Sequence, residues 1–107
     1  RLAILSNNDS RLRAILNDLG ATELFEHLFI SSEIGHEKPA KEIFQKVERV
    51  LRTSPGDMLH LGDSRSRDID GALAAGWQTV LYSSEEIELP VGVARVGRFP
   101  ELLDLLP

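Results

Sequence analysis

The stretch MLHLGDSRSRDIDGALAAGWQTVLY, residues 58–82, decides the fold class of this 107-residue chain. It begins with a short apolar run, Met58 to Leu61, whose length and flanking turn residues predict a buried strand. The residues from Asp68 to Ala75 predict a helix that ends at Gly76, and Gln78 to Tyr82 predict a second strand. A strand, a helix and a strand in this order indicate a right-handed βαβ unit and therefore a parallel sheet.

The same alternation of strands and helices extends toward both ends of the chain. Further strands are predicted at Leu2–Leu5, His27–Ser31 and Val93–Val96, and a terminal helix at Phe99–Leu106. One helix is predicted over Leu12–Leu19, and another follows Lys38-Pro39 and presents Ile43, Phe44, Val47, Val50 and Leu51 on one face. The expected fold is a three-layer α/β/α, Rossmann-like parallel sheet in a single domain spanning residues 1–107.

Composition excludes several functional classes. The net charge is -5 and the basic residues are scattered, so a nucleic-acid partner is not expected. No apolar run approaches the roughly 20 residues of a spanning helix, so a membrane is not expected either. The absence of cysteine excludes disulfides, zinc-thiolate sites and thiol catalysis, and a cytoplasmic location is the default expectation. The chain opens on Arg1 and runs directly into a strand, which predicts a piece of a longer protein.

Polar residues follow the predicted strands, at the edge of a parallel sheet where ligands bind. Asp63 follows Gly62 after the strand that ends in Leu61, and Asp68 lies five residues later. Two such carboxylates can contribute to a magnesium site, because hard divalent cations take oxygen ligands. Alternatively, Asp68 and Asp70 only occupy the first turn of a helix whose dipole favours acids. For Asp70 we expect capping or solvent exposure.

The other strand ends carry Ser6, Asn7 and Lys38. Ser6 and Asn7 form either an ordinary helix cap or a cradle for a phosphate oxygen. Lys38 is either a solvated lysine or a cation that neutralises phosphoryl charge beside the acids. His60 is interpreted as a buried spacer within a strand, and the histidines are not spaced as transition-metal ligands.

Taken together, three segments resemble the second, third and fourth signature motifs of the haloacid dehalogenase superfamily, subfamily I. They are LAILSNND (residues 2–9), GHEKPAKEIF (35–44) and HLGDSRSRDIDGALAAGW (60–77). The resemblance implies a phosphoryl-transfer mechanism with an aspartate nucleophile, a second aspartate as acid and base, and Mg²⁺.

By the same resemblance, each candidate residue has an expected role. Ser6 would donate a hydrogen bond to the phosphoryl group, with the Asn7 backbone beside it. Lys38 would pair with the nucleophile and the phosphoryl charge. Asp63 would bind magnesium, and Asp68 would hold the metal or its water shell.

The sequence departs from the family in lacking the first motif, an Asp-x-Asp, and the helical cap that follows it. We therefore expect this chain to be the C-terminal part of a hydrolase core domain and to be inactive alone. We expect the full-length protein to be a magnesium-dependent phosphatase that acts on a small phosphorylated metabolite. One alternative is a non-catalytic binding or regulatory domain, and a receiver-like domain fits the flanking pattern poorly. Another is a metal-independent 2-haloacid dehalogenase, against which Gly62-Asp63 argues because it keeps the metal carboxylate.

Overall fold

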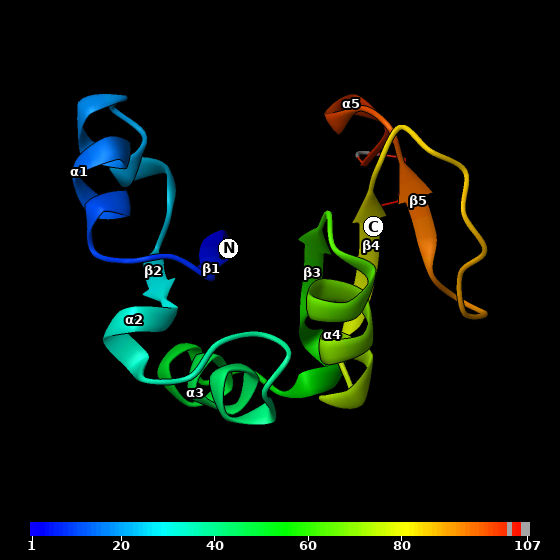
Figure 1. The fold of residues 1–107 in the computed structure, drawn as a ribbon, viewed down its shortest axis with the longest axis horizontal. Coiled ribbons are helices and arrows are strands. Elements are labelled where there is room, and N and C mark those ends of the chain that lie inside the picture. The colour runs from blue at the N-terminus through cyan, green and yellow to red at the C-terminus, as the bar shows by residue number, and fades with distance from the viewer. Residues whose placement is uncertain (103, 106–107) are drawn as a thin grey trace.

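The computed structural model describes residues 1–102, 104 and 105, which alternate between strands and helices along the chain (Figure 1). The elements are β1 (Ala3–Ser6), α1 (Arg11–Asp18), the 3₁₀ turn η1 (Thr22–Leu24), β2 (His27–Ile30), α2 (Ser31–Ile34), α3 (Lys41–Leu51), the 3₁₀ turn η2 (Pro55–Asp57), β3 (Leu59–Gly62), the π-helix η3 (Arg65–Asp70), α4 (Gly71–Ala74), β4 (Gln78–Tyr82), β5 (Ala94–Val96) and α5 (Phe99–Leu102). The α/β class is confirmed.

The strands form two parallel sheets where the sequence predicted one. β1 pairs with β2, and β3, β4 and β5 form the second sheet in that order. Within the described residues, β1 and β3 each have one strand partner, so each leaves an edge without backbone pairing. Figure 1 shows these two strands on either side of the middle of the molecule.

One core beneath the sheets holds them together. Helix α3 lies below both sheets in Figure 1, and its side chains Ile43, Phe44 and Val47 are buried. They pack with Phe29 from β2 and with Ala72 and Trp77 from the second half of the chain. Trp77 is only 4% exposed within this core. Burial of this shared apolar surface is the main term that fixes one sheet relative to the other.

Several predicted elements differ in detail. Ser31 begins α2 instead of ending β2, and Asp68 lies inside a π-helix instead of starting an α-helix. Helix α5 ends at Leu102, and Leu106 lies outside the described residues. None of the described helices has the length and apolarity needed to cross a bilayer.

Helix α1 buries less of its apolar face than its sequence pattern predicts. Ile15 is 53% exposed and Leu19 is 73% exposed. The first sheet has only two strands, about 5 Å apart, whereas a helix with its side chains is about 10 Å across. So narrow a sheet does not cover a full helix face.

Candidate functional site

A buried ion pair joins the loop between α2 and α3 to the π-helix η3 that follows β3. Lys38 Nζ lies 2.5 Å from Asp68 Oδ1, and the two side chains are only 10% and 4% exposed. A pair removed from water in this way is little screened by salt. It therefore fixes the position of the Lys38 ammonium group.

The carboxylate of Asp68 accepts hydrogen bonds on both oxygens. His60 Nε2 lies 2.8 Å from Oδ1, the same atom that Lys38 contacts, and the Ser64 backbone N–H donates to Oδ2 at 3.0 Å. Burial raises the pKa of Asp68, but the hydrogen bonds from His60, Lys38 and Ser64 together outweigh burial and hold that pKa well below its usual range. Asp68 is therefore a carboxylate at neutral pH.

The π-helix η3 and a glycine bring Asp68 to this position. Ser64 caps η3 by accepting from the Arg67 N–H, and its carbonyl accepts from the N–H groups of Asp68 and Ile69. π-Helical turns are frequent at functional sites because they re-aim a side chain. A Cβ on Gly62 would lie 2.1 Å from Asp68 Cγ, so the Asp68 carboxyl fits only against a glycine.

Asn7, at the end of β1, holds the backbone of Lys38. Its Nδ2 donates to the Lys38 carbonyl at 3.0 Å, and its Oδ1 accepts from the Lys38 N–H at 2.8 Å. Ser6 is half-buried at the last position of β1, directly before Asn7. The carboxyl ends of β1 and β3 thus meet through Lys38.

Asp63 differs from Asp68 in being exposed at the tip of β3. Across the part of the chain that the structure describes, no hydrogen bond or ion pair to its carboxylate is found, and no three His, Cys, Asp or Glu side chains converge as a metal site. A carboxylate open to solvent, directly after a glycine, fits one ligand position of Mg²⁺, which commonly takes one or two carboxylates and several waters. Asp68, whose oxygens already accept three hydrogen bonds, fits a supporting position better.

The family model of the haloacid dehalogenase-like hydrolases matches residues 1–76 of the sequence. This part of the chain contains every residue of the site. This chain belongs to that hydrolase family. It is 36% identical over 110 residues to the haloacid dehalogenase-like hydrolase domain-containing protein 3 of Homo sapiens, covering 100% of this chain and 44% of that protein. It is 32% identical to the pyrimidine 5'-nucleotidase YjjG of Escherichia coli, covering 98% of this chain and 48% of the nucleotidase.

Solved structures of the haloacid dehalogenase-like hydrolases share the fold. The putative HAD-hydrolase YfnB of Bacillus subtilis, solved bound to magnesium, superimposes with a TM-score of 0.88 at 30% identity, covering 97% of this chain and 48% of YfnB. The chain thus spans about half the length of the relatives it matches.

The structure brings together residues from all three hydrolase motifs. Asn7 and Asp68 both contact Lys38, whereas Asp63 stands apart in solvent. The Asn7 side chain positions Lys38, and the expected contact of the Asn7 backbone with a phosphoryl group stays a prediction. Asp70 is exposed and pairs with Arg65, as expected of a residue outside the site.

The sequence reasoning missed His60, which it treated as a spacer. His60 is buried as expected, but its ring nitrogen belongs to the Asp68 cluster. The signal available was a single polar side chain inside an apolar strand, two residues before Gly62. A buried polar group requires a hydrogen-bond partner, and the nearby acids were the available ones.

Proposed function

We propose that this chain supplies the charge-stabilising half of the active site of a magnesium-dependent phosphatase, within a longer protein that acts on a small phosphorylated metabolite. The observation that carries the proposal is the buried Lys38–Asp68 pair, with the exposed carboxylate of Asp63 five positions before Asp68 in the chain. Relatives named as phosphatases support it. They include N-acylneuraminate-9-phosphatase of Mus musculus, 30% identical over 92 residues, and glyceraldehyde 3-phosphate phosphatase of Methanopyrus kandleri, 42% identical over 62 residues.

In this proposal the two aspartates have different tasks. Asp63 binds Mg²⁺, which when bound supplies positive charge for phosphoryl oxygens. Asp68 stays ionised and anchors Lys38, whose ammonium neutralises charge that develops on the transferring group. Ser6 donates its hydroxyl to a phosphoryl oxygen at the end of β1.

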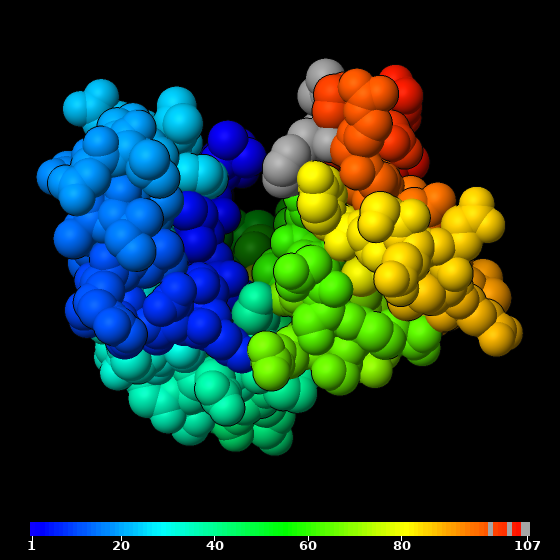
Figure 2. Space-filling model, turned by 45° about the horizontal axis from the view of Figure 1, so that its top comes forward, coloured from blue at the N-terminus to red at the C-terminus, as the bar shows by residue number. Residues whose placement is uncertain are grey.

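The nucleophile would come from a segment outside these 107 residues, entering between β1 and β3. Both strands have an edge without a strand partner in the described part of the chain, and Figure 2 shows a hollow between the blue N-terminal segment and the green and yellow one. Such edges leave backbone N–H and C=O groups unpaired until a strand adds to them. A strand inserted there would join the two sheets into one.

An open groove on the β1 side of the site supports a small polar substrate. It is lined by Asn7, Asn8, Asp9, Ser31, Ser32, Gly35, His36 and Glu37, most of them polar. Hydroxyl, amide and backbone groups of this kind recognise a polar organic moiety attached to a phosphate.

The test is phosphate release from p-nitrophenyl phosphate by the full-length protein, with Mg²⁺ and after chelation with EDTA. We expect turnover that requires Mg²⁺ and returns when Mg²⁺ is added back. Halide release from 2-chloropropionate without metal would support the dehalogenase alternative instead. Binding of inorganic phosphate without any turnover would support the non-catalytic alternative.

A further inference from the structure

We propose that His60 is a positioning residue that fixes the Asp68 carboxylate and, through it, the ammonium group of Lys38. The inference rests on the proposed function, in which Lys38 stabilises the transferring phosphoryl group. The observation behind the inference is that two side chains contact the same carboxylate oxygen. Asp68 Oδ1 lies 2.8 Å from His60 Nε2 and 2.5 Å from Lys38 Nζ.

The shared atom places a hydrogen on Nε2 of His60. A carboxylate oxygen only accepts hydrogen bonds, so Nε2 carries the hydrogen that is donated to Asp68. Asp68 Oδ1 therefore accepts from His60 and from Lys38 at the same time.

The imidazole ring is held by the core around it. His60 is 9% exposed, and its ring packs edge-on to Phe44 and Trp77, with centroid separations of 6.1 and 6.2 Å. Trp77 is itself fixed by donating from Nε1 to Glu48 Oε2 at 2.7 Å. The direction of the His60 N–H is therefore set by packing.

The backbone of His60 is equally constrained. In β3 it is the register partner of Thr79, and Thr79 Oγ1 donates to the His60 carbonyl at 3.0 Å. Lys38, by contrast, reaches Asp68 through a flexible four-carbon stem from a loop. His60 is thus a rigid support that orients the longer Lys38 side chain through Asp68.

The kinetic test uses the full-length protein with p-nitrophenyl phosphate and Mg²⁺. For His60→Leu we expect kcat to fall about tenfold or more, with KM changed less than about threefold. The reason is that the Lys38 ammonium group would move away from the transferring phosphoryl group, which it stabilises in the transition state. His60→Gln, whose amide N–H can replace Nε2–H, should restore kcat to within about threefold of wild type. His27→Leu is the matched control, since His27 is exposed on β2, and it should leave kcat unchanged.

A second readout does not depend on turnover. In NMR spectra of the full-length protein, the Lys38 Nζ resonance should shift in His60→Leu, return toward wild type in His60→Gln and stay unchanged in His27→Leu. Equal kinetic loss in both His60 variants, wild-type kcat in His60→Leu, or an unmoved Lys38 resonance would overturn the inference. An inactive wild-type protein would instead overturn the proposed function, while the Lys38 resonance would still decide the role of His60.

Discussion

The side-chain amide of Asn7 pairs with both backbone groups of Lys38, at 3.0 Å through Nδ2 and at 2.8 Å through Oδ1. Asn7 follows β1 in the first sheet, and the Lys38 side chain reaches Asp68, which follows β3 in the second. These contacts connect the two sheets at the ends of their strands. The cation of the site is thus held from its backbone on one side and from its ammonium group on the other.

Asn7→Ala removes both hydrogen bonds to Lys38 and leaves two backbone groups without their partner. We expect the free energy of unfolding of the full-length protein to fall by about 1 to 3 kcal/mol in urea titrations. Asn17→Ala is the control, because Asn17 is exposed on α1, and it should change stability by less than about 0.5 kcal/mol. Equal effects of the two substitutions would contradict the role given to Asn7.

Gly62→Ala tests the close packing of Asp68 on β3. The added Cβ would lie 2.1 Å from Asp68 Cγ, so the carboxylate must move away from Lys38 and His60. We expect a loss of about 1 to 3 kcal/mol in stability and a large loss of activity. Gly56→Ala has nothing within 4 Å of its new Cβ and should be nearly neutral in both measurements.

The lowered pKa of Asp68 predicts a pH dependence of stability. An unfolded aspartate titrates near pH 4, so the unfolded chain takes up this proton before the folded chain does. The stabilisation is fully present above about pH 4 and is lost as the pH falls below it toward the folded pKa. In Asp68→Asn, the free energy of unfolding between pH 4.5 and 3 should fall less steeply than in wild type. Parallel curves for the two proteins would show that Asp68 is not held in its ionised form.

The sequence was sufficient to predict the order of strands and helices, since apolar runs and helical periodicity are local patterns. Strand β4 matches its predicted bounds. The split into two sheets was not predicted. Local patterns show where a strand lies, but they do not show which strand pairs with which, and β1 and β3 do not pair with each other.

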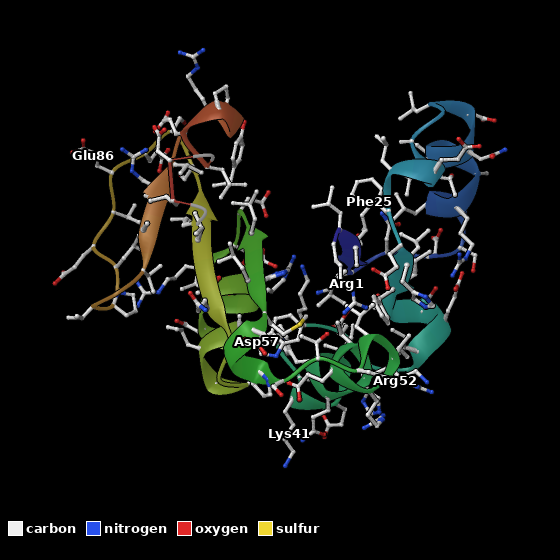
Figure 3. The ribbon with its side chains drawn as sticks, turned by 180° about the vertical axis from the view of Figure 1, so that it is seen from behind. Arg1, Phe25, Lys41, Arg52, Asp57 and Glu86 are labelled. Carbon is white, nitrogen blue, oxygen red and sulfur yellow. The ribbon has the colours of Figure 1, made fainter. Side chains whose placement is uncertain are left out.

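The sequence proposed candidate site residues but not their contacts. The resemblance to the hydrolase motifs singled out Lys38 and Asp68, while the structure adds that they touch and that Asp63 stands outside their contact. The π-helix that turns Asp68 inward depends on hydrogen bonds to Ser64, and helical periodicity alone does not distinguish it from an α-helix. In Figure 3, Glu86 lies on the loop outside β5, whereas Arg1 lies beside β1 near the middle of the molecule.

The central claim is that Asp63 is the magnesium carboxylate of a phosphatase site, and one comparison tests it most directly. Phosphate release from p-nitrophenyl phosphate is measured against Mg²⁺ concentration for the full-length wild type, Asp63→Asn and the matched control Asp70→Asn, an exposed aspartate seven positions further along the chain. We predict that Asp63→Asn lowers kcat by roughly 10²-fold or more and raises the Mg²⁺ needed for half-maximal rate, while Asp70→Asn stays within about threefold of wild type. Turnover by Asp63→Asn at the wild-type rate and with the wild-type Mg²⁺ dependence would contradict the account.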